Sequence, residues 1–364
     1  MIPLNDLSMH LADYDFDLPG ELIAAFPSEK RGDDRLLVLD RNRAELAHRH
    51  FSDLPAFLRA GDLLVLNDVK VRRARLRARK SPGGGAAAVL LIKPTADETL
   101  WECLLDTHRR LRPGQMFLLA DGTQAELVSR ENKPGGSALI RFERAIDSDF
   151  LDRYGEVPLP PYILKRRMED PAHTAQDDER YQTVYADQGT ALAAPTAGLH
   201  FTQEMLARLE QAGVRLARLT LDVGWGTFAP IRTEDIRRHQ MHAETFELSP
   251  QLVREVISAK QEARRVVAVG TTVVRALESA AAQAGTAPTI NALRAGRYAT
   301  DLFIIPGYHF RAVDALITNF HTPRSSLLVL VSAFAGRERI LAAYTEAAAQ
   351  GYRFFSYGDA MLMV

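Results

Sequence analysis

The sequence predicts an α/β domain with a mixed sheet, interrupted by a small inserted antiparallel β-barrel domain. Between Gly61 and about Arg144, short apolar runs recur at roughly ten-residue spacing with turn signals between them, which is typical of a barrel or sandwich. After Glu156, helix-like and strand-like segments alternate, which indicates an α/β sheet. The first sixty residues are too few to form such a sheet alone. We therefore expect an α/β domain of residues 1–66 and 158–364, with residues 67–157 as the insert.

The runs assigned to the β domain are rich in Leu, Val and Ile. They are DLLVLN (62–67), AVLLIKP (88–94), LWECLLD (100–106), MFLLA (116–120), AELVS (125–129) and ALIRF (138–142). Segments such as SPGGG, RPG and ENKPGG separate them, and Gly and Pro favour turns.

The α/β elements carry start and stop signals. Ser249 followed by Pro250 predicts the start of a helix over LVREVISAKQEARR, because Ser suits the N-cap and Pro the first helical position. VVAVG (266–270) predicts a buried strand. TTVVRALESAAAQAG (271–285) predicts a helix that ends at Gly285, and ATDLFII (299–305) and DALITNF (314–320) predict further strands.

The overall composition does not indicate a binding partner, but it does indicate the cellular compartment. The 364 residues carry 45 basic and 46 acidic side chains, a net charge of -1, so a nucleic acid would have to bind a local cluster of positive charge. Cys103 is the single cysteine, which excludes an internal disulfide and cannot alone hold a structural zinc or an iron–sulfur cluster. The N-terminus lacks a secretory pattern and no run of eighteen apolar residues occurs. We therefore expect a cytoplasmic protein that does not bind membranes.

Chemistry is expected in loops where strands end. The sequence contains no G-x-G-x-x-G, G-x-x-x-x-G-K-[ST], H-E-x-x-H or G-x-S-x-G motif, which removes support for dinucleotide-binding, Walker-type, zincin and α/β-hydrolase functions. Ligands of open α/β sheets bind at the carboxyl ends of strands. Four loops of small and polar residues occupy such positions.

Two of these loops lead into helices. Gly270, Thr271 and Thr272 follow the strand VVAVG, and a helix N-terminus there suits a carboxylate or phosphate; a threonine cap after a tight turn explains the pattern equally well. The segment APTAGLHFT (194–202) precedes the predicted helix QEMLARLEQAG, and its small residues permit close approach of a flat ligand. The alternative is a tight turn in which His200 is structural.

The other two loops combine glycine, aromatic and polar residues. DVGWGTF (222–228) follows the strand LARLTL and places Trp225 between two glycines, which suggests exposed backbone beside a stacking ring. TNFHTPRSS (318–326) gathers amide, imidazole, guanidinium and hydroxyl groups between a strand and an apolar helix. His321 has more polar neighbours in this loop than a packed histidine needs, and an ordinary pKa near 6.5 suits proton transfer at neutral pH.

A metal site is not expected. His239 and His242 could share a metal if they lay three residues apart on one helix, with Glu244 close by. No further cluster of ligands supports them, so substrate contact or a structural role is preferred.

One segment concentrates positive charge. KVRRARLRARK (70–80) holds seven basic residues in eleven and no acid. Alternate arginines share one face of a strand and span about 20 Å there, so the phosphates of a folded RNA could follow them. A merely solvated strand face is the alternative. The arginines of this row are Arg73, Arg75, Arg77 and Arg79.

A series of phrases runs in order along nearly the whole chain. They are DFDLPGELIAAFP, DRLLVLDR, GDLLVLND, PLPPYI, YQTVYA, APTAGLHFT, VGWGTF, HQMHAETFEL, AVGTTVVRALES, DLFIIPGY, LITNFHTPRSSLL, LVSAFAG and YRFFSYGDAM. Together they resemble the S-adenosylmethionine:tRNA ribosyltransferase-isomerases of queuosine biosynthesis. That family's α/β domain with an inserted β-barrel agrees with the boundaries above. Its members usually have a histidine where this chain has Asp222.

The resemblance implies a tRNA-modifying transferase that is also an isomerase. It would transfer the ribosyl part of S-adenosylmethionine to the aminomethyl-deazaguanine (preQ1) wobble base of tRNA, giving epoxyqueuosine and releasing adenine and methionine. S-adenosylmethionine would be a co-substrate, with no prosthetic group and no metal, and a monomer is expected. Proton transfers are assigned to His321, His200 and Asp222, and tRNA binding to the arginine row. Substrate contacts are assigned to Pro195, Thr196, Gly198, Gly224, Trp225, Gly226, Thr227, Gly270, Thr271, Thr272, Asn319, Arg324 and Ser325.

Two other functions fit the same surfaces. An S-adenosylmethionine-dependent RNA methyltransferase would need the same co-substrate but would leave S-adenosylhomocysteine. A non-catalytic tRNA-binding protein would explain the basic row but would not explain the polar residues in the four loops.

Overall fold

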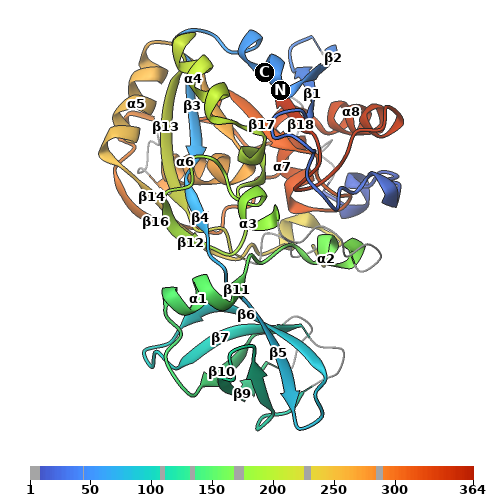
Figure 1. Cartoon of the computed structure of the whole chain (residues 1–364). Coiled ribbons are helices and arrows are strands. Elements are labelled where there is room, and N and C mark those ends of the chain that lie inside the picture. The colour runs from blue at the N-terminus through green and yellow to red at the C-terminus, as the bar shows by residue number, and fades with distance from the viewer. Residues whose placement is uncertain are drawn as a thin grey trace. The chain divides into compact units, whose positions relative to one another are not determined.

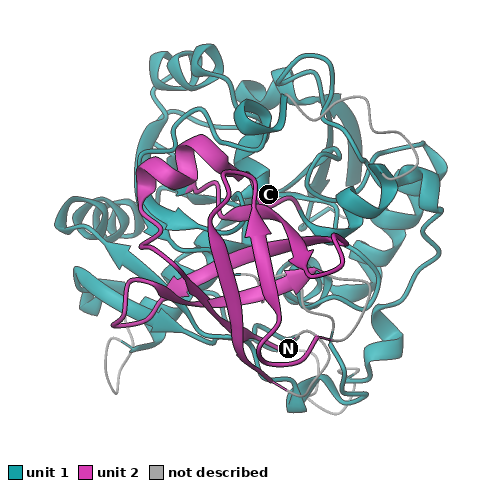
Figure 2. Ribbon diagram, turned by 60° about the horizontal axis from the view of Figure 1, so that its bottom comes forward, with its two compact units in different colours: residues 1–70, 160–364 teal, residues 71–159 magenta. Residues whose placement is uncertain are grey.

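A computed structural model describes residues 9–43, 45–106, 111–131, 136–167, 176–224, 231–283 and 290–364 (Figure 1). The chain divides into two compact units, residues 1–70 with 160–364 and residues 71–159 (Figure 2). None of the described helices is both long and apolar enough to cross a lipid bilayer.

The first unit is built on a mixed nine-stranded sheet, as the sequence predicts. Its strands lie in the order β16-β14-β13-β3-β15-β17-β18-β1-β2. The four central strands β13, β3, β15 and β17 run parallel. Strands β14 and β18 pair antiparallel with the outer members of this group, and β18 pairs parallel with β1. In chain order the strands are β1 Arg35–Asp40, β2 Glu45–His50, β3 Leu63–Asn67, β13 Arg215–Leu221, β14 Glu244–Leu248, β15 Val266–Val269, β16 Gly296–Thr300, β17 Ala315–Asn319 and β18 Ala360–Met363.

Helices cover both faces of this sheet (Figure 1). Leu63 and Val65 of β3 pack with α5, α6, α7 and α8, whereas Leu64 and Leu66 pack with α4 on the opposite face. Such burial on both faces is typical of a central parallel strand. The helices of this unit are α2 Pro161–Arg167, α3 Asp177–Arg180, α4 Gln203–Gln211, α5 Pro250–Gln261, α6 Thr271–Gln283, α7 Ser326–Ala335 and α8 Arg337–Ala349. A small sheet pairs β4 Val69–Val71 with β12 Gln188–Ala191.

The second unit is a closed antiparallel barrel, which also confirms the predicted fold class. Six strands follow the order β5-β6-β7-β10-β9-β8, and pairing of β8 with β5 closes the ring. They are β5 Arg75–Ser81, β6 Ala86–Pro94, β7 Leu100–Asp106, β8 Met116–Leu119, β9 Gln124–Arg130 and β10 Ala138–Phe142. Helix α1 (Ser148–Tyr154) and the short strand β11 (Gly155–Glu156), which pairs with β5, complete the unit.

Several predicted elements are confirmed. Helix α5 begins after Ser249, whose hydroxyl accepts from Leu252 N at 3.1 Å, with Pro250 in its first turn. The strands predicted at VVAVG and DALITNF are β15 and β17. The predicted end of the next helix, at Gly285, lies outside the described residues.

Two strand predictions are wrong in place or extent. The ten-residue spacing groups DLLVLN with the barrel runs, although the predicted boundary assigns residues 1–66 to the α/β domain. The run is β3 of the α/β sheet, because it is buried on both faces between β13 and β15. ATDLFII is a strand only in its first two residues, since β16 ends at Thr300.

Candidate functional site

A cavity of about 330 Å³ opens in the first unit at the carboxyl ends of β15 and β17. This is the edge where open α/β sheets bind ligands, and the volume lies at the lower end of the range for small-molecule sites. The lining comes from residues 161–162, 194–197, 270–272, 318–327 and 355–356, together with Val223.

Two helices begin at this cavity. Gly270, with φ +91°, makes the turn from β15 into α6 and donates its N–H to Ile317 O at 2.8 Å. The first N–H groups of a helix have no acceptor within the helix, and Gly270 has no side chain with which to cap them. At α7 the hydroxyl of Ser325 caps Leu328 N at 3.2 Å. The α6 N-terminus is therefore the more open position for an anionic group.

An aromatic pair forms another part of the lining. The rings of Tyr162 and Phe355 stack with centroids 4.2 Å apart, and the Tyr162 hydroxyl accepts from Ser356 N at 2.9 Å. Burial raises the pKa of Tyr162, so this phenol stays protonated at neutral pH. A flat aromatic surface of this kind suits a purine ring.

Backbone strain is concentrated here. Phe355 and Arg324 have φ of +73° and +56°, and among the described residues only Ala263 is a third non-glycine residue with positive φ. Such conformations cost of order 1–3 kcal/mol and cluster at functional sites. The Arg324 backbone is held by a bond from its N–H to Tyr14 O at 2.9 Å, and its side chain pairs with Asp15 at 2.6 Å.

His321 lies in the lining and is only 7% exposed. Its Nε2 lies 3.0 Å from Thr318 Oγ1, and its backbone N–H donates to Tyr344 Oη at 3.2 Å. Burial lowers its pKa to about 3, which corrects the expected value near 6.5. The ring is therefore neutral at physiological pH, and no other histidine, aspartate, glutamate or lysine occurs in the described lining.

This burial predicts acid sensitivity that depends on His321. A folded-state pKa of about 3 lies below the unfolded value near 6.5, so the unfolded chain binds the extra proton first and stability is lost as pH falls from 6.5 toward 3. Between pH 7 and pH 5 the loss should reach about 2 kcal/mol. Melting temperatures of His321→Asn should therefore fall less over this range than those of the wild type. An equal fall in both would contradict the prediction, and the exposed His309→Asn serves as the control.

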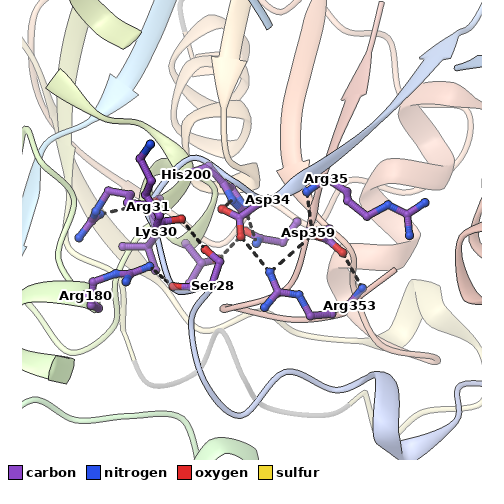
Figure 3. A network of polar contacts seen from close by, with 12 residues as sticks. Ser28, Lys30, Arg31, Asp34, Arg35, Arg180, His200, Arg353 and Asp359 are labelled. Atoms are coloured by element: carbon purple, nitrogen blue, oxygen red, sulfur yellow. Dashed lines mark hydrogen bonds and ion pairs between the residues drawn. The ribbon is translucent and has the colours of Figure 1, made fainter. Parts of the chain in front are cut away.

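His200 is not part of the described lining and lies beside Asp34 (Figure 3). It ends a short 3-10 helix, η6 Thr196–His200, and is 2% exposed. Its Nδ1 lies 2.7 Å from Asp34 Oδ2, and its Nε2 lies 3.0 Å from Asn319 Nδ2. Both ring nitrogens are thus occupied by protein groups, which does not fit the expected direct proton transfer.

Asp222 does not lie in the described lining either. It is exposed, and its Oδ1 accepts from Thr190 N at 3.2 Å. The described residues therefore give no support to proton exchange by Asp222 at this cavity, and that assignment stays a prediction.

Eight of the thirteen expected substrate contacts line the cavity. Gly198 and Gly224 do not: a Cβ on Gly198 would lie 2.0 Å from Tyr185 Oη, so that glycine serves close packing, and Gly224 N donates to Glu244 at 3.1 Å. Trp225, Gly226 and Thr227 lie outside the described residues. The eight are Pro195, Thr196, Gly270, Thr271, Thr272, Asn319, Arg324 and Ser325.

Sequence reasoning missed Tyr162, Phe355 and Asp34. The phrases PLPPYI and YRFFSYGDAM contain the two aromatic residues, and their aromatic content was the available signal. No local pattern marks Asp34, because its partner His200 follows 166 residues later.

The arginine row lies in the second unit beside an open groove of about 1000 Å³ lined by Arg75, Arg77 and Arg79. Arg73 precedes β5 and donates from Nε to Gly155 O at 2.8 Å, so it does not continue the strand row as expected. Glu156 pairs with Arg75 at 2.7 Å and also with Arg77. Arg79 is exposed and makes no ion pair with a described residue.

The geometry of the histidine pair differs from that of a helical metal site. His239 ends the 3-10 turn η8 (Ile236–Arg238), and the chain from there to β14 is not helical, so His239 and His242 are not on one helix face. Within the described ranges no group of three or more His, Cys, Asp or Glu side chains could hold a metal ion.

The chain is similar to known proteins along nearly its full length. Residues 11–363 match the family described as queuosine biosynthesis protein. Proteins called S-adenosylmethionine:tRNA ribosyltransferase-isomerase are 46% identical in Treponema denticola (97% of this chain, 99% of that protein) and 48% identical in Trichlorobacter lovleyi (98% and 100%). The crystal structure of S-adenosylmethionine tRNA ribosyltransferase from Thermotoga maritima is 33% identical, covers 97% of this chain and 100% of that one, and has a TM-score of 0.53. This chain therefore belongs to the queuosine biosynthesis protein family of S-adenosylmethionine:tRNA ribosyltransferase-isomerases.

Proposed function

We propose that this chain transfers and isomerises the ribosyl part of S-adenosylmethionine onto the aminomethyl-deazaguanine (preQ1) wobble base of tRNA, releasing adenine and methionine. The observation that carries the proposal is full-length similarity to proteins that bear this enzyme's name. The cavity supports it independently, because an aromatic pair, an open helix N-terminus and a neutral imidazole lie together in one lining.

The first chemical step requires a base. The positive sulfur of S-adenosylmethionine acidifies the adjacent ribose carbon, which must lose a proton before it can attack the modified base. We assign this proton to His321. Because the ring is neutral, it does not repel the sulfonium, and accepting the proton leaves an imidazolium next to the negative charge that forms on carbon.

The low pKa of His321 also suits the later step. Its imidazolium is a strong acid, with a pKa of about 3 in the ligand-free site, so it gives up its proton readily. Departing adenine needs a proton on nitrogen to leave as the neutral base. One residue could thus serve first as base and then as acid.

The remaining lining would bind the other parts of the co-substrate. Tyr162 and Phe355 would stack on adenine. The open N–H groups at the start of α6, at Thr271 and Thr272, would hold the methionine carboxylate. Arg324 would hold a tRNA phosphate after exchange of its partner Asp15.

The arginine row would bind tRNA phosphates. Each phosphate contact contributes roughly one unit to the slope of log affinity against log salt. We expect Arg79→Gln to lower this slope by about one, because Arg79 makes no ion pair with a described residue. Arg75→Gln should lower it less, since Glu156 already neutralises Arg75.

The replacement of all four arginines by glutamine should flatten the slope most. Arg141→Gln on β10 provides a matched control, because Arg141 pairs with Asp97 at 2.7 Å and does not line the groove. An unchanged slope of log tRNA affinity against log salt after the quadruple replacement would mean that the arginine row is only a solvated strand face.

Product analysis tests the proposed function. The protein is incubated with S-adenosylmethionine and tRNA that carries the precursor base, and the digested nucleosides are weighed by mass spectrometry. We expect epoxyqueuosine, free adenine and methionine. S-adenosylhomocysteine would identify a methyltransferase, and absence of S-adenosylmethionine binding in isothermal titration would favour a tRNA-binding protein. We further expect a monomer in size-exclusion chromatography and, for an enzyme acting on tRNA, a cytoplasmic place of action.

A further inference from the structure

A chain of buried side chains leads from Asp34 to the cavity, and Figure 3 shows its first members, Asp34 and His200. His200 joins Asp34 to Asn319, and the Thr196 hydroxyl donates to Asn319 Oδ1 at 2.9 Å. Asp34, His200 and Asn319 are 6%, 2% and 3% exposed, so no bulk water competes for these bonds. Thr196 and Asn319 line the cavity, whereas Asp34 and His200 do not.

Asp34 fixes the direction of its hydrogen bond with His200. Burial by itself would raise the pKa of Asp34, but interaction with His200 and Arg353 outweighs it and lowers the pKa below its ordinary value. Arg353 Nη2 donates to Asp34 Oδ1 at 2.9 Å. Asp34 is therefore a carboxylate without a proton, and the Nδ1 of His200 must donate to it.

This arrangement sets the orientation of the next two groups. The Thr196 hydroxyl donates to the amide oxygen of Asn319, so the amide nitrogen of Asn319 faces His200 Nε2 at 3.0 Å. Nε2 must then accept this bond, which leaves the ring proton on Nδ1 alone. The amide oxygen of Asn319 takes the single hydroxyl proton of Thr196. Only the lone pairs of Thr196 Oγ1 are left to face the cavity.

We infer that Asp34 and His200 are positioning residues that make Thr196 a hydrogen-bond acceptor for an O–H or N–H group of the bound co-substrate. The inference rests on the proposed function only for the identity of that ligand. Ribose hydroxyls and the methionine amino group of S-adenosylmethionine are donors of the required kind. Protonation of His200 at Nε2 would reverse the Asn319 amide and make Thr196 present its proton instead.

Two substitutions of His200 separate its two hydrogen bonds. In His200→Gln the side-chain oxygen can take the place of Nε2 and accept from Asn319, but the bond to Asp34 is lost. In His200→Asn the amide can take the place of Nδ1 and donate to Asp34, but it does not reach Asn319. Both full-length variants are compared with the wild type in melting temperature, in S-adenosylmethionine affinity by isothermal titration, and in adenine release with tRNA.

The positioning role predicts that kcat/KM of His200→Asn lies roughly tenfold to a hundredfold below that of His200→Gln, the range for one buried hydrogen-bonding group left unpaired. Affinity for S-adenosylmethionine should follow the same order. Three other results would overturn the inference. A lower kcat/KM in His200→Gln than in His200→Asn would mean that the main role of His200 is to hold Asp34. An equal loss of kcat/KM in two folded variants would indicate proton transfer by the ring, and an unchanged kcat/KM in both would mean that the orientation of Asn319 does not matter.

A measurement on the wild type needs no turnover. The measurement uses ¹⁵N spectra of histidine-labelled protein at pH 7.5. The signals of His200 are those that vanish in a His200 variant. We expect them to show a ring that carries its proton on Nδ1 and has no proton on Nε2. An Nε2–H tautomer or an imidazolium would overturn the inference. If the wild type releases no adenine, the proposed function fails, and this spectrum and the titration still decide the role of His200.

Discussion

Replacement of His321 by asparagine should lower turnover by roughly two to four powers of ten, the range for loss of general acid–base catalysis. His321 is the only side chain in the described lining that has an unprotonated ring nitrogen at neutral pH and can therefore act as a base, because Tyr162 keeps its proton and Arg324 remains charged. Asparagine is of similar size and can keep a hydrogen bond to Thr318, but it cannot take up the proton from the ribose carbon. Adenine release under saturating S-adenosylmethionine and tRNA measures the effect.

Donor affinity separates catalysis from a packing role. We expect His321→Asn to bind S-adenosylmethionine within a few-fold of the wild type, since the substitution removes a titrating group and no cavity wall. His309→Asn, at an exposed position outside the lining, should change neither quantity. Near-normal turnover per folded molecule, combined with reduced stability at neutral pH, would mean that His321 is structural and would shift the assignment of the base to His200 or Asp222.

Local patterns in the sequence predict most elements of the fold but not all pairings. Ser249 with Pro250 marks the start of α5 because both signals act within one turn. DLLVLN contains no such information: an apolar run of this length suits a barrel strand and a central parallel strand equally well. Its partners, β15 and β13, lie about 150 to 200 residues later in the chain, and only they decide that it is β3.

The candidate site depends even more on contacts between distant residues, which local patterns in the sequence do not predict. The loops 194–197, 270–272 and 318–326 are predictable as a group, because each carries small or polar residues at an expected strand end. The role of His200 depends on Asp34, and the neutral state of His321 depends on burial from several elements. The positive φ of Phe355 likewise results from tertiary packing, since no local signal requires it of a phenylalanine.

Removal of the barrel should abolish most tRNA binding while leaving a folded α/β core. Arg73 and Gly155 already contact each other, with Arg73 Nε 2.8 Å from Gly155 O, so residues 74–154 can be replaced by a short Gly/Ser joint without stretching the chain. The excised segment contains Arg75, Arg77 and Arg79. We expect tRNA affinity to fall roughly a hundredfold or more at low salt, because these phosphate contacts are lost together.

The core itself should melt in one cooperative transition and bind S-adenosylmethionine within about threefold of the intact chain, because every described residue of the cavity lies outside 74–154. A matched control inserts the same Gly/Ser joint at Gly114, before β8, where an added Cβ would meet no atom within 4 Å and which does not line the groove. That variant should keep tRNA affinity. Loss of cooperative melting in the excised protein would contradict the predicted domain division, since a true insert leaves the packing of its host sheet intact. Unchanged tRNA affinity after excision would instead move the main RNA-binding surface from the barrel to the α/β unit.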